Sequence, residues 1–485
     1  MTIKRLYMTM IRKENIIKNE IDNKRITLSY KEMEISDSPF DLFRKIYHMF
    51  DYAFLLESAN SDTRLAEYSF IGYNPSKIFK AKGNLVEVQS RDTSRTLKEQ
   101  VKDPLKKLRE VVIRSSIEDY KFRFIGGAVG YISYGAINYW EEFGKLVSRA
   151  TGFPDMEFGL FNDVIVFDHK RGKAYSLTKG SNSGDVMKDI PIQTIPLKSP
   201  DATPLHLSPN KKRFIEEVKR IKEQIASGDI FQAVISKRYD FKTRGDLLAF
   251  YEKLKEINPS PYMFYLKFGK RQIIGSSPEM LYRVDGKKVE TFPIAGTRPF
   301  ISGSDKNAKF REELMADPKE SAEHLMLVDL ARNDIGKISR YGSVKVISFM
   351  DVREFSHVQH IVSHVVGEIK NGADCFDVMR ATFPAGTVTG APKVRAIEII
   401  DSLEESPRGP YAGAVGYFSF NGNSDFAIAI RTLFANGAKC YIQTGAGIVA
   451  DSIPENEWNE TEEKAGALLQ ALYGSFSKVK ISREK

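Results

Sequence analysis

The chain has 485 residues, of which 42% are hydrophobic and 28% charged, a composition typical of a globular protein with a large core and roughly two or three domains. Its net charge is +9, but Lys and Arg are scattered among acidic residues, which disfavours the alternative of a basic nucleic-acid-binding protein. No apolar run reaches membrane-spanning length, the N-terminus lacks the apolar segment of a secretory signal, and two isolated cysteines favour a reducing cytoplasm.

Composition divides the chain into segments. The polar residues 1–25 are expected to form a loosely attached extension or a short helix, and residues 26–179 mix strand-like and helix-like stretches. Residues 180–207 are rich in Ser, Asp, Pro and Lys, which predicts a linker or surface loop. Regular patterns resume over residues 208–475, and residues 476–485 are expected to be a tail.

Periodicity and β-branched runs predict the elements in chain order. Residues 26–179 contain, in turn, the helix Pro39–Phe50, the strands Ala53–Glu57 and Tyr68–Ile71, the helix Pro104–Ile113, and the strands Gly126–Ile132 and Asp163–Asp168. Residues 208–475 begin with a helix to Ser227 that Ser208 is expected to cap, followed by the strands Ile230–Phe241 and Gln272–Ser276, the helix Lys319–Asp334, the strands Val344–Phe349, Val358–Val366, Ala412–Phe420, Phe426–Phe434 and Lys439–Thr444, and the helix Pro454–Tyr473. Because helices and strands neither alternate strictly nor segregate, we predict an α+β fold with large antiparallel sheets.

The segment Phe383–Ile399, FPAGTVTGAPKVRAIEI, stands out because glycines, prolines and threonines precede a cationic, helix-compatible run. Such a loop can direct backbone N–H groups, hydroxyls and a helix N-terminus toward an anionic ligand. The alternative is a plain loop-to-helix junction, and these residues alone do not separate the two.

Acidic residues recur at helical spacing in two distant places. Glu320 and Glu323 share one helix face, and Glu457 and Glu460, with Lys464 one turn further on, repeat the pattern near the C-terminus. Two such helices could converge on one Mg²⁺, which needs few protein carboxylates. The alternative is two solvated helix faces.

The histidines His357, His360 and His364 lie in a strand-like pattern without a nearby cysteine, which disfavours zinc. One of them facing a cleft could be a general acid or base, and a hydrogen-bonded structural histidine is the alternative. The glycine-rich segments GAG and AGT, and the carboxylate after the Ser-Ser-Pro turn, are placed where loops meet ligands. These residues are Gly445, Ala446, Gly447, Gly296, Thr297 and Glu279.

The ordered motifs GDIFQAVISKR, SSPEML, PIAGTRP, SAEHLMLVDLARNDIGK, VQHIVSHVVGE, FPAGTVTGAPKVRAIEIID, YAGAVGYFSF and TGAGIVADSIPENEWNETEEKA closely resemble the chorismate-utilising enzymes. The resemblance covers roughly residues 208–473 and extends upstream through LLES and YSFIG. It implies antiparallel sheets packed as a sandwich with helices on the outside, and a chorismate-binding catalytic region at 208–475.

Two positions distinguish members of the family. Isochorismate and salicylate synthases carry a water-activating lysine where this chain has Gln232, and aminodeoxychorismate synthases carry a nucleophilic lysine where it has Ala295. The remaining resemblance is to anthranilate synthase component I, in which ammonia adds to C2 of chorismate and pyruvate is eliminated. Aminodeoxychorismate synthase component I, which makes 4-amino-4-deoxychorismate, is the alternative.

The resemblance implies roles for individual residues. Glu323 and Glu460 would bind Mg²⁺, with Glu320 and Glu457 as secondary partners, and Glu279 would be the general acid for loss of the C4 hydroxyl. His360 would serve the elimination of pyruvate, while Thr387 and Lys393 would shape or close the pocket. The implied substrate-binding residues are Gly296, Thr297, Tyr411, Arg431, Gly445, Ala446, Gly447 and Lys464.

The resemblance also implies an inhibitor and a partner. LLES and NPSPYMFY match the family's tryptophan-inhibition site, which would place L-tryptophan against Glu57, Ser58, Pro261, Tyr262 and Met263. Core packing is the alternative for part of that surface. Neither cysteine has the context of an amidotransferase nucleophile, so a separate glutamine amidotransferase subunit, component II, is expected to supply ammonia in a heterodimer or heterotetramer.

Overall fold

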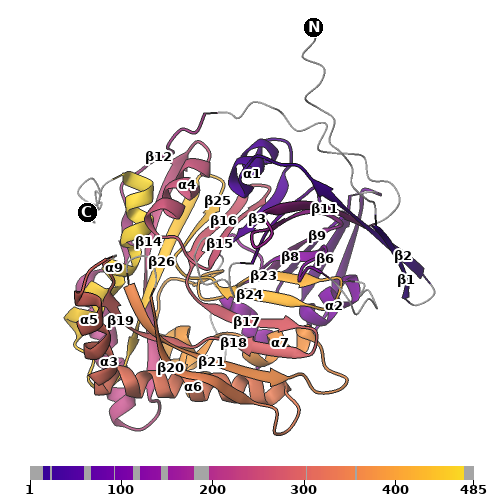
Figure 1. The fold of residues 1–485 in the computed structure, drawn as a ribbon. Helices are drawn as coiled ribbons and strands as arrows, with labels where there is room; N and C mark the ends of the chain where they lie inside the picture. Colours follow the sequence, from indigo (N-terminus) through magenta and orange to yellow (C-terminus); the bar gives the residue numbers. More distant parts are fainter. Residues whose placement is uncertain are drawn as a thin grey trace.

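The computed structural model describes residues 15–21, 24–58, 67–91, 93–112, 121–141, 143, 151–179, 196–301, 303–354 and 358–474. Two large antiparallel sheets face each other, and helices cover their outer faces (Figure 1). This confirms the predicted α+β class and the sandwich. In the part of the chain described, no helix is long and apolar enough to cross a membrane.

The first sheet has the strand order β1 (Asn15–Ile21), β2 (Lys24–Met33), β11 (Lys173–Lys179), β10 (Asp163–Asp168), β4 (Tyr68–Tyr73), β3 (Tyr52–Glu57), β15 (Tyr262–Phe268), β16 (Arg271–Ser277), β25 (Thr432–Asn436), β26 (Lys439–Ile448), β14 (Gln232–Arg244) and β12 (Asp201–Ala202). The short strands β13 (His206–Ser208) and β22 (Gly390–Ala391) also pair with β14. The second sheet has the order β19 (Ile294–Pro299), β21 (Val358–Glu368), β18 (Lys288–Thr291), β17 (Met280–Asp285), β24 (Ser424–Ile428), β23 (Ala414–Ser419), β8 (Gly127–Ile132), β9 (Met156–Phe161), β5 (Lys77–Lys82), β6 (Leu85–Ser90) and β7 (Arg95–Gln100), and β20 (Lys345–Glu354) pairs with β21.

The helices of the described residues are α1 (Pro39–Tyr47), α2 (Pro104–Val111), η1 (Tyr134–Tyr139), α3 (Lys211–Ala226), α4 (Leu248–Ile257), α5 (Lys306–Ala316), α6 (Pro318–Ile338), α7 (Cys375–Thr382), η3 (Gly386–Val388), α8 (Lys393–Leu403) and α9 (Pro454–Tyr473). Helices α1, α4 and α9 pack on the outer face of the first sheet, and α6 and α7 pack on the second. The C-terminal helix thus lies in the same layer as helices from the middle of the chain (Figure 1).

The N-terminal and C-terminal regions share both sheets. Strand β3 pairs with β15 in the first sheet, and β8 pairs with β23 in the second. On β3, Phe54 faces the core between the sheets, while Ala53 and Leu55 face the helix layer, so both faces are buried. Such two-sided burial explains why residues 53–56 of this strand are all apolar.

Three local expectations were wrong. Helix α3 is capped by Asn210, whose side chain accepts from the backbone N–H of Arg213, and not by Ser208, which ends β13. The predicted strand Phe426–Phe434 is two strands, β24 and β25, which belong to different sheets. Within the N-terminal extension, residues 15–21 form the strand β1 rather than a short helix, and residues 1–14 lie outside the described residues. Most of the expected linker, residues 180–195, lies outside the described residues. The expected tail, residues 476–485, also lies outside them.

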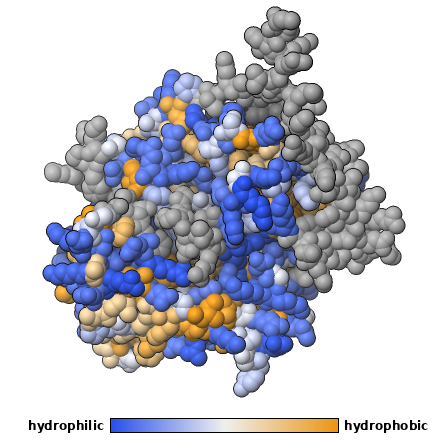
Figure 2. All heavy atoms as spheres, in the orientation of Figure 1, coloured by the Kyte–Doolittle hydropathy of each residue, from blue (hydrophilic) through white to orange (hydrophobic). Residues whose placement is uncertain are grey.

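The face drawn in Figure 2 is largely hydrophilic, with an apolar area in its lower part, where α6, β20 and β21 lie in Figure 1. Exposed apolar side chains of α6 and β20 are Leu325, Ile347 and Phe349. Most large apolar side chains of the described residues are instead inside, between the sheets or under the helices.

Candidate active site

Helices α6 and α9 bring the predicted carboxylates together. Asp317 caps α6 by accepting from the backbone N–H groups of Lys319 and Glu320 at 3.0 and 3.3 Å, which fixes the first turn. Burial, followed by the charges of Glu320 and Glu460, raises the pKa of Glu323. Carboxylates from two segments far apart in the sequence therefore share one neighbourhood.

Glu457 belongs to the same cluster. Burial and the charge of Glu460 raise its pKa, and a hydrogen bond from Ser452 opposes them. Among the described residues, no three acidic, histidine or cysteine side chains are grouped closely enough to hold a metal ion without other ligands.

Two cations border the carboxylates. The ammonium of Lys464 forms an ion pair with Glu460 and donates to the carbonyl oxygen of Gly445 at 3.0 Å. The guanidinium of Arg431 donates to the carbonyl oxygen of Lys464, also at 3.0 Å. Arg431 has a φ of 51° and lies at the turn where the chain leaves β24 in one sheet for β25 in the other. The turn from β24 to β25 thus places the Arg431 guanidinium near Lys464 and the carboxylates of α9.

Glu279 lies on the turn between β16 and β17, and its backbone N–H donates to the hydroxyl of Ser277 at 3.3 Å. Burial raises the pKa of Glu279 to about 7, although Thr387, Lys464 and Arg431 each lower it. A carboxyl of this pKa is present in both protonation states near neutral pH, which suits a general acid.

His360 on β21 is oriented through its Nδ1 atom. This nitrogen donates to the carbonyl oxygen of Gly296 at 2.7 Å, and the hydroxyl of Thr297 lies 3.2 Å from it. Burial lowers the pKa of His360, the Gly296 contact raises it, and Arg431 lowers it further. The ring is therefore neutral near pH 7, with Nε2 as its basic nitrogen.

Gly296 occupies a position that excludes a side chain. Its φ is 66°, and a methyl group there would lie 2.8 Å from Leu314 Cδ1 and 3.1 Å from Glu320 Oε2. The glycine thus allows the strand to approach α5 and α6 closely enough for its carbonyl to orient His360.

The GAG segment on β26 presents two glycines to one face of its strand. A methyl group on Gly445 would lie 2.9 Å from the hydroxyl of Tyr411, and one on Gly447 would lie 2.6 Å from Nε2 of Gln232. Ala446 faces the opposite side, where it is fully buried with Ile235. Only the backbone of Ala446 is therefore on the glycine side.

The two predicted residues of the opening loop have different surroundings. Thr387 lines a pocket with Glu279, and its buried hydroxyl makes no hydrogen bond of good geometry to a described residue. Lys393 donates to Asp334 at 2.9 Å and to the carbonyl oxygen of Thr382 at 3.4 Å. Asp334 lines the Glu279 pocket, whereas Lys393 lines a separate, open cavity. Lys393 therefore lies behind an ion pair rather than beside Glu279.

The other histidines contribute nothing to this cluster in the described residues. His364 Nε2 lies 2.9 Å from Glu290, and its ring stacks on Phe292 with centroids 4.0 Å apart. His357 lies outside the described residues.

A second pocket lies between β3, β15 and the second sheet, and it gathers all the residues predicted for the inhibitor site: Glu57, Ser58, Pro261, Tyr262 and Met263. Ser58 donates to the carbonyl oxygen of Pro261 at 2.8 Å. Glu57 accepts from Lys255 at 2.6 Å and from the hydroxyl of Tyr251 at 2.9 Å. The pocket wall formed by Glu57 and Ser58 is therefore polar, and both side chains are held by hydrogen bonds.

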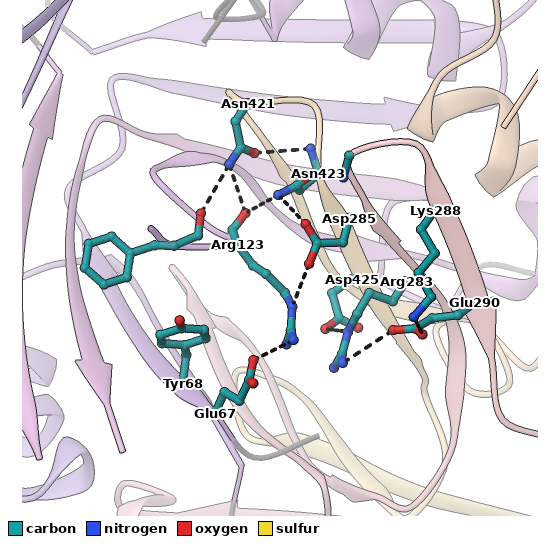
Figure 3. Close-up of polar contacts among 12 residues, drawn as sticks. Glu67, Tyr68, Arg123, Arg283, Asp285, Lys288, Glu290, Asn421, Asn423 and Asp425 are labelled. Atoms are coloured by element: carbon teal, nitrogen blue, oxygen red, sulfur yellow. Dashed lines mark hydrogen bonds and ion pairs between the residues drawn. The ribbon is translucent and has the colours of Figure 1, made fainter. Parts of the chain in front are cut away.

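Arg123 and Arg283 form another wall of the second pocket, each held by acidic side chains (Figure 3). Arg123 pairs with Glu67 at 2.6 Å and with Asp285 at 3.3 Å. Arg283 donates to Asp425 at 2.7 Å and lies 3.9 Å from Glu290, which also accepts from Lys288 (Figure 3). These arginines were not expected from the sequence, where nothing distinguishes them from surface cations.

Sequence reasoning also missed Asp334 and the buried Arg408. Asp334 was expected only as the end of a helix, but it joins Lys393 to the wall of the Glu279 pocket. Arg408 follows Glu404 by four residues, and this ion-pair spacing was the available signal.

The comparisons with known proteins agree with this geometry. Residues 51–470 match the family described as chorismate binding enzyme. Anthranilate synthase component 1 of Methanothermobacter marburgensis is 48% identical over 440 residues, covering 90% of this chain and 92% of the relative. Aminodeoxychorismate synthase component 1 of Bacillus subtilis is 38% identical over 465 residues, covering 92% of this chain and 97% of the relative.

A solved structure extends the agreement to the fold. The crystal structure of anthranilate synthase component I from Streptococcus pneumoniae TIGR4 matches with a TM-score of 0.74 and 37% identity, covering 83% of this chain and 92% of that one. The family match includes every residue of the carboxylate cluster, Glu279, His360 and both cations. This chain therefore belongs to the chorismate-binding enzyme family.

Proposed function

We propose that this chain is the aminating subunit, component I, of an anthranilate synthase. It converts chorismate and ammonia into anthranilate, pyruvate and water, the first step of tryptophan biosynthesis. The observation that carries the proposal is the buried carboxyl of Glu279, with a pKa raised to about 7, beside Arg431 and Lys464. The cations suit the two carboxylates of chorismate, and the carboxyl suits a leaving hydroxyl.

In the first step, ammonia forms the C–N bond at C2, the ring double bonds shift, and the C4–O bond breaks. Glu279 gives its proton to the departing oxygen, which leaves as water. Arg431 and Lys464 hold the substrate's carboxylates, and the backbone of Gly445 and Gly447 gives them room.

In the second step, a base removes the C2 proton, the C3–O bond breaks as the ring becomes aromatic, and the departing enolate takes up a proton to become pyruvate. His360 serves as that base because its Nδ1 proton is engaged by Gly296, which makes Nε2 the basic nitrogen. The lowered pKa of His360 keeps the ring neutral near pH 7.

Magnesium is proposed for Glu323 and Glu460, with Glu320 and Glu457 beside them. Burial, followed by the charges of Glu320 and Glu460, raises the pKa of Glu323, and this supports the fit because a cation would offset the repulsion between the carboxylates. Water and substrate oxygens would complete the coordination, as is usual for Mg²⁺. When bound, the ion would neutralise and orient the ring carboxylate.

Two residues favour this reaction over others of the family. Ala295, on β19, offers a methyl group where a covalent mechanism needs a lysine, which argues against aminodeoxychorismate synthase. Gln232 is buried beside Gly447 and has no basic group to activate water. Ammonia itself is then the nucleophile.

Ammonia is proposed to come from a separate glutamine amidotransferase subunit, component II. Cys375 and Cys440 are buried, at 1% and 2% exposure, and burial raises the pKa of Cys440 to about 11. A glutaminase nucleophile needs an accessible thiolate, so neither thiol suits that role.

The second pocket is proposed to bind L-tryptophan as a feedback inhibitor. Its apolar lining, including Met263 and Phe264, suits an indole ring, and the polar groups near Ser58 suit the amino acid moiety.

The test is to incubate the purified chain with chorismate, an ammonium salt and MgCl₂, and to measure anthranilate fluorescence and pyruvate release together. Equal amounts of both products support the proposal. Accumulation of an aminated product that releases pyruvate only after a separate lyase is added would instead identify an aminodeoxychorismate synthase. Matched reactions with Glu279→Gln control for contaminating activity.

A further inference from the structure

We propose that Arg408 is a positioning residue that holds the segment 383–392 against Glu279. Arg408 is 4% exposed, and its guanidinium joins three parts of the fold. Nη1 donates to the carbonyl oxygen of Val388 at 2.8 Å, and Nη2 donates to that of Val234 at 2.6 Å. Both Nε and Nη2 donate to the Glu404 carboxylate, at 2.8 and 2.7 Å.

The contact with Val388 matters because the preceding residue is Thr387. That residue lines the Glu279 pocket, together with Ala385 and Gly386. Held by its carbonyl, η3 is fixed as one wall of the pocket that Glu279 also lines. Arg408 therefore acts on Glu279 through the backbone and does not contact the carboxyl, although its guanidinium also lies 5.8 Å from the ring centroid of Tyr411.

The charge of Arg408 is fully compensated in this position. Oε1 of Glu404, which accepts from Nη2 of Arg408, also accepts from the backbone N–H and the hydroxyl of Ser236, at 2.8 and 2.6 Å. The guanidinium also lies over the ring of Tyr134, 4.6 Å from its centroid. A paired and hydrogen-bonded buried arginine can thus serve as a rigid link between β14, α8 and the loop.

Lysine cannot replace this link. The planar fork of Arg408 reaches two carbonyls and a carboxylate in different directions, whereas a lysine ammonium is a single point at the end of a flexible stem. Arg408→Lys keeps the charge for Glu404 but is expected to release Val388.

The proposal rests on the proposed function for its kinetic readout. For Arg408→Lys we expect kcat for anthranilate formation to fall about tenfold to a hundredfold, because small displacements near the reacting atoms are costly. The chorismate KM should change by less than about threefold, because the proposed carboxylate contacts come from Arg431 and Lys464 instead.

A double-mutant cycle separates positioning from general damage. In a Thr387→Val background, Arg408→Lys should lower kcat by less than about twofold further, because both changes act through one loop. If Arg408→Lys lowers kcat in the Thr387→Val background by the same factor as in the wild-type chain, the proposal is overturned. An Arg408→Lys variant with wild-type kcat would also overturn it.

The matched control is Arg238→Lys. Arg238, on β14, has 14% of its side chain exposed and donates to the carbonyl oxygen of Pro407 at 3.2 Å. Its charge is paired with Asp240, and no hydrogen bond of Arg238 reaches the 383–392 segment. We expect wild-type kcat for this variant. If Arg238→Lys lowers kcat as much as Arg408→Lys does, the positioning role cannot be assigned to Arg408.

Hydrogen exchange gives a readout independent of activity. Amides of residues 385–391 should exchange at least about tenfold faster in Arg408→Lys, while those of β26 stay protected. Unchanged exchange in folded Arg408→Lys protein would overturn the proposal about Arg408, whether or not the wild-type chain makes anthranilate. A wild-type chain that makes no anthranilate would refute only the proposed function. If Arg408→Lys does not fold, Arg408→Gln/Glu404→Gln removes both charges together, and the same kinetic and exchange criteria apply.

Discussion

The guanidinium of Arg283 donates through Nε to the carboxylate of Asp425 at 2.7 Å, and both side chains are buried in the wall of the second pocket (Figure 3). Asp425 also accepts from the hydroxyl of Tyr262 at 2.9 Å. This pair joins β17 to β24 beneath β15, so the shape of the second pocket depends on a buried charge pair.

Asp425→Asn should therefore destabilise the fold. Arg283 is 3% exposed and would lose its nearest anion, which typically costs about 3 kcal/mol or more in a buried site. Asp285→Asn is the control, because that carboxylate is 52% exposed and pairs at 3.3 Å, so about 1 kcal/mol or less is expected. Urea unfolding of both variants measures the difference, and equal effects would contradict this account.

The pH dependence of catalysis should report Glu279. Its proposed role as general acid needs the proton, and a pKa of about 7 means that the protonated form dominates below pH 7 and is lost above it. kcat should therefore fall as pH rises through about 7 when rates are compared at equal concentrations of unprotonated ammonia. Glu279→Gln should lose most activity, and its remaining kcat should no longer fall as pH rises through about 7. If the fall persists in this variant, the titration belongs to another group.

Magnesium dependence should follow the carboxylate cluster. Glu323→Gln and Glu460→Gln should each reduce Mg²⁺-dependent turnover about a hundredfold or more, as several kcal/mol of lost transition-state stabilisation implies. Asp329→Asn, on the exposed face of α6, should retain normal rates. Magnesium titrations of anthranilate formation make the comparison. Near-normal turnover in either glutamine variant would refute the metal assignment.

Tryptophan inhibition should weaken when the second pocket is altered. Ser58→Ala removes a hydroxyl that donates to Pro261, and Met263→Thr removes apolar contact area. Each is expected to raise the inhibitory tryptophan concentration about tenfold without changing kcat, since loss of one contact is worth about 1.4 kcal/mol. Ser76→Ala, which removes a hydrogen bond to Leu160 outside the pocket, is the control. Unchanged inhibition in both pocket variants would count against this site.

Local patterns predicted the parts of the site that lie on single elements. Glu320 and Glu323, like Glu457 and Glu460, were expected to share helix faces because helical spacing is set by backbone geometry alone. The structure confirms α9 with its predicted bounds and brings both pairs together. The closing of α6 onto α9 could not come from spacing, because it depends on how the two sheets stack.

The errors occurred where the fold, rather than local preference, decides. The run Phe426–Phe434 has no glycine or proline to mark a break, yet the chain turns at Arg431 with a positive φ because β24 and β25 pair in different sheets. Arg408 was not singled out because an arginine beside prolines and glycines resembles an exposed turn. Its burial follows from the meeting of β14, α8 and η3.

By itself, the amino-acid order determined the family, the α+β class, the helix faces that carry acidic residues and the absence of a lysine at positions 232 and 295. Those properties depend on residue identity and short-range periodicity, which a linear chain displays directly. Only the tertiary structure decided which way Lys393 points, that Arg408 is buried, and that the pKa of Glu279 is raised to about 7. Each of these follows from burial and from charges contributed by distant segments, and such surroundings exist only after the two sheets have packed.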